Sequence, residues 1–430
     1  MKVSWIKTPF LLVAVGFLPV PTQVCATEIS WPDQTIGTLK KNKMDLAERP
    51  DAANGETSDL SAMIDAAGAG SDPSENPSSS QKEMPIEHPS EEHSGLTRLV
   101  DTPKLRITGF SDLGFTSTLT DSQRQSTFFL GDVDLFITSE ITDQLSFLSE
   151  AVFYAVPGSD FQAVQLERVI LKYSFSDIFN VEIGRMHTPL GYWNEAFHHG
   201  VWLQTTVARP EIYLFEYEPG GGFLPVHSVG IDLSGTENLM AFALGYHLAV
   251  LNGRGEDPYD VQQYTDAINA KAIDVSLSLK PHFTEGLQAG ATTYLDMIPP
   301  DPPARTKKTA ERIVGGYLVY VRDRAEFLGE VFDIHHADRS SGRDFASQGF
   351  YLQASYKITQ FTPYYRFDRV SFGVGDPFFA SLPAVDNSRH TMGMKWDVLS
   401  WSALKLEYAL ATLKASPNQH TITADVSFVF

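Results

Sequence analysis

Apolar and polar residues alternate along much of the chain between residues 104 and 430, in segments that turn-forming residues separate. The last segment shows the pattern most clearly. One face of this strand would carry Ile422, Ala424, Val426, Phe428 and Phe430, and the other would carry Thr421, Thr423, Asp425 and Ser427. Such a strand fits the wall of a membrane barrel between lipid and water, and it also fits a half-buried position in a soluble sheet.

Sixteen segments of this kind can be marked out, and most have about the length that a tilted strand needs to cross a bilayer. They span residues 104–118, 127–141, 144–156, 163–175, 178–187, 226–234, 238–251, 270–280, 286–297, 312–322, 325–335, 347–358, 361–371, 389–399, 402–413 and 420–430. An even number of antiparallel strands returns both ends of this region to the same side of a membrane.

The connections between the segments favour the membrane barrel. They are short after the even-numbered segments, as at residues 142–143, 176–177 and 235–237, and longer after the odd-numbered ones. The long ones cover residues 188–225, 252–269, 298–311 and 372–388. Barrels of the bacterial outer membrane have short periplasmic turns and long extracellular loops, whereas a soluble sandwich has no reason to sort its loops in this way. The predicted fold is therefore all-β, a transmembrane antiparallel β-barrel of about 16 strands over residues 104–430.

Charged residues occupy the polar faces of these strands. Because a charge on the lipid face costs about 2–4 kcal/mol near the bilayer centre, the polar faces should point into the lumen, and a barrel of this size leaves an aqueous channel. The candidate pore-lining residues are Asp132, Asp134, Glu150, Arg168, Lys172, Glu182, Lys280, Glu326, Glu330, Arg366, Asp368, Lys395 and Lys405. Opposite charges on adjacent strands could also simply neutralise each other.

The longest connection, residues 188–225, follows the fifth strand. Long loops without secondary structure of their own are usually functional or disordered, and this one is rich in aromatic residues, which argues against disorder. It could fold into the lumen and narrow the pore, or pack as a lid on the surface. Its constriction candidates are Trp193, Glu195, His198, Arg209 and Glu211.

The first 103 residues have a different composition. Two lysines precede an apolar stretch over residues 9–20, and VCA follows it at residues 24–26, which predicts a signal peptide over residues 1–26. Its removal would also remove Cys25, the only cysteine. Residues 27–103 are rich in Ser, Pro, Gly and acidic residues, which predicts a disordered acidic periplasmic arm. Residues 59–70 could form a short helix for oligomerisation or for tethering to peptidoglycan, or be part of a plain linker.

Net charge and hydropathy limit the kinds of partner that the chain is expected to bind. The formal net charge of −20 argues against nucleic acid. No segment after the apolar stretch offers the roughly 18 consecutive apolar residues that a membrane-spanning helix needs. The expected partners are outer-membrane lipid, small hydrophilic solutes or ions, and the barrel-assembly machinery, which would engage the C-terminal strand ending at Phe430.

Two short motifs carry a family resemblance. The sequence VEIGRMHTPLGYW at residues 181–193, and LNG at residues 251–253 before a long loop, resemble phosphate-selective porins of bacterial outer membranes. The resemblance implies a porin barrel in a Gram-negative-type bacterium, a passive channel for small hydrophilic solutes or ions, and a possible homotrimer. Phosphate preference in that family rests on inward basic residues. The inward charges here are mixed, which favours weak cation preference or little selectivity over an anion or phosphate channel.

Motifs for other chemistry are absent from the sequence. It contains no GxSxG, HExxH, Walker-type or CxxC pattern, so no enzymatic activity, cofactor or metal is expected. The pairs at residues 198–199 and 335–336 are histidines, but adjacent residues of a strand point to opposite faces and do not chelate as a unit. The remaining alternatives to a passive porin are a substrate-specific channel of the same fold and, further away, an outer-membrane enzyme or adhesin.

Overall fold

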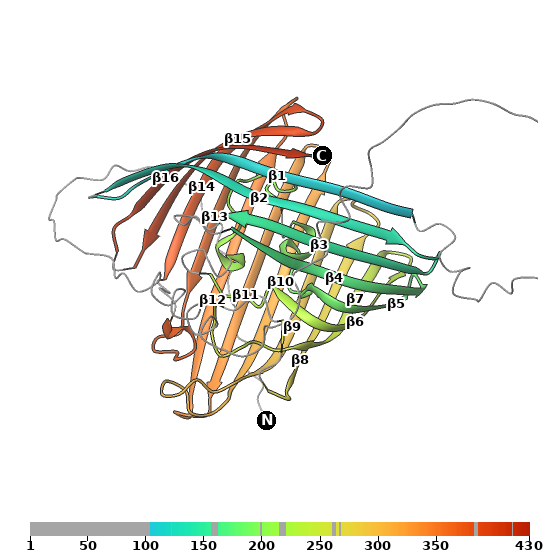
Figure 1. The fold of residues 1–430 in the computed structure, drawn as a ribbon, viewed down its shortest axis with the longest axis vertical. Coiled ribbons are helices and arrows are strands. Elements are labelled where there is room, and N and C mark those ends of the chain that lie inside the picture. Colours follow the sequence, from blue (N-terminus) through green and yellow to red (C-terminus); the bar gives the residue numbers. More distant parts are fainter. Residues whose placement is uncertain are drawn as a thin grey trace, which may run out of the picture. The chain divides into compact units, whose positions relative to one another are not determined.

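The fold is a closed ring of antiparallel strands, seen in a computed structural model of the chain (Figure 1). The structure describes residues 104–121, 123–155, 162–197, 200–214, 221–259, 264–265, 268–381, 386–414 and 416–430. The predicted signal peptide and acidic arm lie outside these residues. Within the described residues, sixteen strands form the ring, and each pairs with its neighbours in the chain, as the colour order of Figure 1 shows. Pairing of the first and last strands closes the ring.

The sixteen predicted segments correspond one to one with the observed strands. The strands are β1 (Lys104–Leu119), β2 (Arg124–Glu140), β3 (Leu145–Ala155), β4 (Gln162–Ser176), β5 (Phe179–His187), β6 (His227–Asn238), β7 (Phe242–Asn252), β8 (Lys271–Pro281), β9 (Leu287–Ile298), β10 (Thr309–Arg322), β11 (Ala325–Asp338), β12 (Arg343–Tyr356), β13 (Phe361–Ser371), β14 (Asn387–Leu399), β15 (Ser402–Leu413) and β16 (Gln419–Val429). In the described parts of the loops between strands there are three short helical turns, α3 (Trp193–Ala196), η1 (Glu211–Tyr213) and η2 (Phe379–Ser381).

Side chains alternate across the barrel wall as the period of two requires. In β8, Ile273 and Val275 are 43% and 42% exposed on the outer face, while Asp274 between them is fully buried on the inner face. The same alternation holds in β16, where Ile422 is exposed and Asp425 is buried. The outer face is therefore an apolar surface suited to hydrocarbon, and the inner face is polar.

The connections are short after even-numbered strands and longer after odd-numbered strands, as expected. Short turns join β4 to β5 and β10 to β11, at residues 177–178 and 323–324, whereas residues 188–226 and 253–270 connect β5 to β6 and β7 to β8. One predicted turn was wrong, because residues 235–237 belong to β6 and the turn lies at residues 239–241.

Part of the barrel interior is filled by an apolar core. Two loops, residues 188–226 and residues 372–381, contribute Trp193, Tyr213, Phe223, Phe378 and Phe379 to this core. Inward residues of β7 to β13 complete it, together with Ile170 of β4 and Met186 of β5. Most of the core residues lie on the two loops and on β7 to β13, so the interior is packed mainly on that side. No helix in the described part of the chain is long and apolar enough to cross a membrane.

Candidate functional site

Residues 188–226 fold into the barrel, and we call this segment the inner loop; the structure describes its residues 188–197, 200–214 and 221–226. Its backbone bonds to inward residues of β8, β11, β13 and β15, and the last three of these strands lie far around the ring from β5 and β6. Of the two arrangements that the sequence left open, the structure therefore has the in-folded one.

Glu330 of β11 holds the first half of the inner loop. Its carboxylate accepts hydrogen bonds from the backbone N–H groups of Tyr192 and Trp193, at 2.7 and 2.8 Å. The hydroxyl groups of Tyr213 and Tyr351 donate to the same carboxylate, at 2.9 and 2.7 Å. Only 3% of Glu330 is exposed. A carboxylate with four donors is satisfied without a cation, so this residue fixes the loop and does not face the lumen water.

Gly191 makes the approach to Glu330 possible. Its φ of +75° is one that side chains rarely adopt, and a Cβ atom there would lie 2.1 Å from the Glu330 carboxylate. Glycine is therefore required at this position both for the backbone conformation and for the close contact. Burial and the neighbouring Glu330 raise the pKa of the Tyr213 hydroxyl well above its ordinary value, which keeps it a donor.

Arg366 of β13 holds the middle of the inner loop. Its guanidinium donates to the Thr206 hydroxyl at 3.0 Å and to the carbonyls of Ala208 and Arg209 at 2.7 and 2.8 Å. Its Nε–H group donates to Asp368 at 2.8 Å. Both Arg366 and Asp368 are fully buried, so the two charges compensate each other beneath the loop.

Two residues of β15 complete the attachment. Glu407 accepts hydrogen bonds from the backbone N–H groups of Val207 and Ala208, at 2.8 and 3.3 Å. The Lys405 ammonium donates to the carbonyls of Val201, Gln204 and Thr206. We call the inward face of β11 to β15 the covered wall.

The covered wall has a simple physical basis. An irregular loop inside a barrel has backbone N–H and C=O groups without secondary-structure partners, and buried groups of this kind must be paired. Carboxylates of the covered wall accept hydrogen bonds from the N–H groups of the loop, and cations of the covered wall donate hydrogen bonds to its carbonyl groups. Many of the charges that the sequence suggested as pore lining therefore satisfy the backbone of the inner loop.

The inward face of β3 to β7, which we call the open wall, uses its charges differently. Arg168 pairs with Glu150 on the adjacent strand, and Lys172 pairs with Glu182 at 2.9 Å. The Lys172 side chain is 38% exposed and that of Glu182 is 21% exposed. These residues pair side chain to side chain across neighbouring strands. Arg168, Lys172 and Glu182 remain partly accessible to solvent, whereas Glu150 is fully buried.

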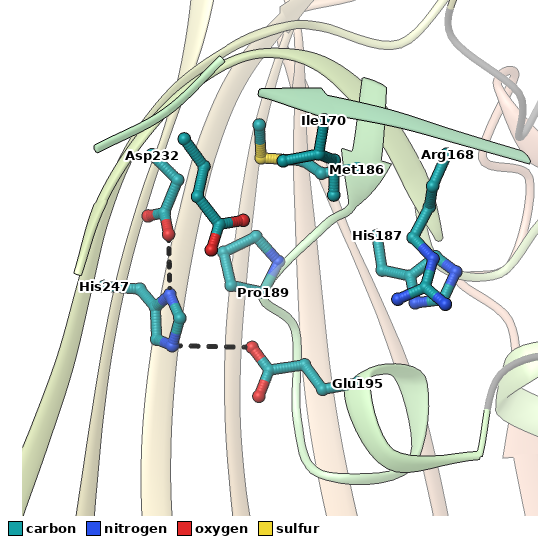
Figure 2. Close-up of a pocket in the computed structure, with 9 residues that line it drawn as sticks. Arg168, Ile170, Met186, His187, Pro189, Glu195, Asp232 and His247 are labelled. Atoms are coloured by element: carbon teal, nitrogen blue, oxygen red, sulfur yellow. Dashed lines mark hydrogen bonds and ion pairs between the residues drawn. The ribbon is translucent and has the colours of Figure 1, made fainter. Parts of the chain in front are cut away.

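A cavity of about 120 Å³ lies between the open wall and α3 of the inner loop (Figure 2). The His247 ring lies between two carboxylates, with Nδ1 at 2.8 Å from Asp232 and Nε2 at 3.7 Å from Glu195. Arg168 and His187 lie on the other side of the cavity in Figure 2. The arrangement places loop and wall charges across a narrow space, which is suited to hold or pass a hydrated ion.

Glu195 is the loop residue most exposed to this space, with 44% of its side chain accessible. Its pKa is raised by burial within the barrel and by the nearby Asp232 and Glu182, and His247 opposes the shift. The carboxylate therefore becomes neutral at a higher pH than an ordinary glutamate does.

The other predicted site residues have varied surroundings. Glu326 accepts from Thr205 of the inner loop, Lys395 is 3.6 Å from Asp397, and Lys280 is exposed at one end of β8. Asp134 is buried on β2, and Asp132 is half-buried beside the bulge between β1 and β2.

The constriction candidates lie at different depths in the packing. Trp193 is buried against Tyr213, with stacked rings 5.2 Å apart. The Glu211 carboxylate accepts from Arg389 at 2.9 Å, and Arg209 lies 6.0 Å from the Trp193 ring. His198 lies outside the described residues. Of these candidates, Glu195 is the one that lines the cavity.

A buried network near the long loops was missed by sequence reasoning. His336 bridges Glu311 at 3.0 Å and Asp376 at 2.6 Å, and Glu311 also pairs with Arg254. Arg254 in turn donates to the carbonyl of Phe223 at 2.6 Å, which links the inner loop to residues 372–381. The expected opposite orientation of the two adjacent histidines is observed, because His335 is 36% exposed and His336 is buried. No signal in the sequence links Arg254 to Asp376.

Metal ligands do not gather in the described part of the chain, where no group of three or more His, Cys, Asp or Glu residues has the geometry to hold an ion.

Comparison with known proteins gives matches at the level of structure. No family profile and no curated protein matches the sequence. An anion-selective porin from Comamonas acidovorans superposes with a TM-score of 0.54 at 13% identity, over 76% of this chain and 100% of that one. OmpF of Salmonella typhi, in complex with daunomycin, gives 0.52 at 10% identity, over 76% and 98%. The outer membrane channel DcaP of Acinetobacter baumannii gives 0.50 at 12% identity, over 76% and 97%. At these identities the similarity establishes a shared barrel fold.

Proposed function

We propose that the protein is an outer-membrane porin, which forms a water-filled channel for passive diffusion of small hydrophilic solutes or ions. The observation that carries this proposal is the inner loop, bound to the covered wall on one side while charged residues of the open wall stay accessible on the other. A loop held inside a sixteen-strand barrel narrows the lumen without any need for a catalytic group. The fold shared with solved porins supports the same function.

The accessible charges inside the barrel would give the channel a weak preference for cations over anions. Arg168 and Lys172 are each paired with a carboxylate, so they offer little net positive charge to an anion. At the cavity, the carboxylates of Asp232 and Glu195 both pair with the single ring of His247. Two negative charges therefore face at most one positive charge, which leaves the cavity with an excess of negative charge. In our proposal, the resemblance to phosphate-selective porins therefore covers the fold and the formation of a channel, but not the preference for phosphate.

Orientation and partners follow from the same proposal. The end of the barrel with the long loops would face the outside, which places residues 27–103 in the periplasm. The C-terminal strand, β16 followed by Phe430, closes the ring against β1, and it would be the segment that the assembly machinery engages. Association of three barrels is expected from the family resemblance.

Electrical recording from purified protein in planar lipid bilayers tests the function. We expect ohmic open-channel current, with a reversal potential in a KCl gradient that indicates modest cation preference. Current blocked by one solute would indicate a substrate-specific channel instead. Absence of current from correctly folded protein would remove the porin proposal and favour an enzyme or adhesin.

A further inference from the structure

The junction at which β1 and β16 close the ring, which we call the seam, carries two aspartates on its inner face. Asp112 of β1 lies opposite Ser427 in the strand register. Asp425 of β16 lies opposite Gly114. The two aspartates are therefore diagonal neighbours across the seam, at a spacing that side chains can bridge. Asp112 is 8% exposed and Asp425 is 2% exposed, so both carboxyl groups are almost completely removed from water.

Glycines make room for the two carboxyl groups to meet. Gly114 leaves no side chain opposite Asp425, and a Cβ atom on Gly131 of β2 would lie 2.1 Å from the Asp112 carboxyl group. That carboxyl group accepts a hydrogen bond from the backbone N–H of Asp132, and it is also hydrogen-bonded to the carboxyl group of Asp425. Two ionised carboxylates are acceptors only, so a hydrogen bond between them requires one proton.

The nearest cation does not donate to this pair. Lys405 lies directly opposite Asp425 in the register of β15 and β16, but its ammonium group donates to three carbonyl groups of the inner loop. An ammonium group has three donors, so none remains for Asp425. Within the described residues, the Ser427 hydroxyl is the one other donor beside Asp425, and no backbone N–H group donates to it. The charge of Lys405 can balance one carboxylate of the pair, but not two.

The other charged groups that face the pair do not supply a second cation. On β2, Asp132 and Asp134 are themselves acidic. On β15, Glu407 is also acidic and accepts hydrogen bonds from the inner loop. On β14, Lys395 lies 3.6 Å from a carboxylate of its own, that of Asp397. Among the described residues around the seam, the balance of charge therefore requires that one carboxyl group of the pair is neutral.

We propose that Asp112 and Asp425 share one proton, and that this proton holds the seam closed. The neutral Asp112 donates from its hydroxyl group to the Asp425 carboxylate and accepts from Asp132 with its carbonyl oxygen. Lys405 balances the one negative charge that remains. Loss of the proton places two buried negative charges across the strand pair on which closure of the ring depends, and these charges repel each other. The inference concerns the stability of the closed barrel, and it does not require that the barrel conducts.

Urea-induced unfolding of the full chain in phospholipid vesicles, measured as a function of pH, tests the proposal. Aspartates of the unfolded chain ionise at about pH 4, so the folded protein binds one more proton above this pH, and its stability should decline as the pH rises until the proton is lost. Over this range the unfolding equilibrium constant should rise by up to about tenfold per pH unit. Asp112→Asn should lack this part of the pH dependence, because its amide can donate to Asp425 at every pH.

Glu182→Gln is the matched control, because it removes a carboxylate of the open wall and should keep the pH dependence of the unmodified protein. Infrared spectroscopy of the folded protein at neutral pH gives a second readout. The carbonyl band of protonated carboxyl groups should weaken in Asp112→Asn but not in Glu182→Gln, and in the unmodified protein it should decrease over the pH range in which stability is lost. An unchanged carboxyl band in Asp112→Asn, or the same pH dependence of unfolding as in the unmodified protein, would overturn the proposal. Conductance recorded in parallel separates failure of this inference from failure of the porin proposal.

Discussion

Glu330 and Glu182 are both carboxylates on the inward face of the same barrel, yet their surroundings differ. Glu330, on the covered wall, accepts four hydrogen bonds, and three of these come from the inner loop. Glu182, on the open wall, pairs with Lys172 on the next strand and remains partly exposed. The difference shows that an inward charge in a barrel can have two roles. It can hold an in-folded loop in place, or it can pair with a charge on the next strand and stay exposed inside the barrel.

Loss of a covered-wall carboxylate should have the largest effect. Glu330→Ala leaves two backbone N–H groups and two tyrosine hydroxyls without their acceptor, and each unsatisfied group costs on the order of 1–3 kcal/mol. We expect the inner loop to detach, with a larger single-channel conductance and faster cleavage of the loop by added protease. Glu182→Ala on the open wall is the control, and an equal increase in cleavage there would contradict the distinction between the walls.

Removal of a covered-wall cation should destabilise the barrel strongly. Arg366→Met leaves Asp368 buried without its partner, which typically costs about 3–5 kcal/mol. Lys172→Met breaks a partly exposed pair and should cost at most about 1 kcal/mol. Urea-induced unfolding in lipid vesicles measures both. Similar unfolding free energies for the two variants would show that Arg366 is not buried beneath the loop.

Neutralising the carboxylates around the cavity should change selectivity with little effect on stability. One charge a few ångströms from a permeating ion in a wet lumen contributes about 1 kcal/mol, so Glu195→Gln should reduce the cation-to-anion permeability ratio by up to about fivefold. Asp368→Asn, beneath the loop, should leave this ratio unchanged. Reversal potentials in a KCl gradient give the comparison, and an unchanged ratio in Glu195→Gln would remove this residue from the ion path.

A lower pH should also reduce the cation-to-anion permeability ratio, but by less than the Glu195→Gln substitution. Because the pKa of Glu195 is raised by burial and by its acidic neighbours, its negative charge is lost at a pH above that of an ordinary glutamate. Cation preference should therefore decline as the pH falls through this raised pKa. Glu195→Gln should lack this part of the pH dependence, and an identical pH profile in the variant would assign the titration to another group.

The number and order of the strands and the inward or outward direction of most side chains could be predicted. They follow from the alternation of apolar and polar residues, which can be seen directly in the sequence. The wrong turn at residues 235–237 has a specific cause. Gly235 resembles a turn residue, but it lies within β6, where a Cβ atom would come within 2.1 Å of the Ile178 carbonyl. A glycine required by a close backbone approach cannot be told from a turn glycine by sequence.

The division into two walls could not be predicted. The partners of Glu330, Arg366 and Lys405 are mostly backbone groups of the inner loop, and backbone groups carry no residue-specific signal. In the sequence, Glu330 and Glu182 are both polar residues in alternating segments, and only the path of the loop separates them. The same limitation hid the network of Arg254, Glu311 and His336, whose members are distant in the chain.

Cysteine accessibility during channel recording tests the two-wall account most directly. Cys25 is the only native cysteine, so single cysteines can be placed at Lys172 on the open wall and at Thr391, which is fully buried on the covered wall. A small cationic methanethiosulfonate reagent should modify Lys172→Cys quickly and lower the current, and it should leave Thr391→Cys unmodified with its current unchanged. Rapid modification of Thr391→Cys, or no effect at Lys172→Cys, would contradict a channel that runs along the open wall.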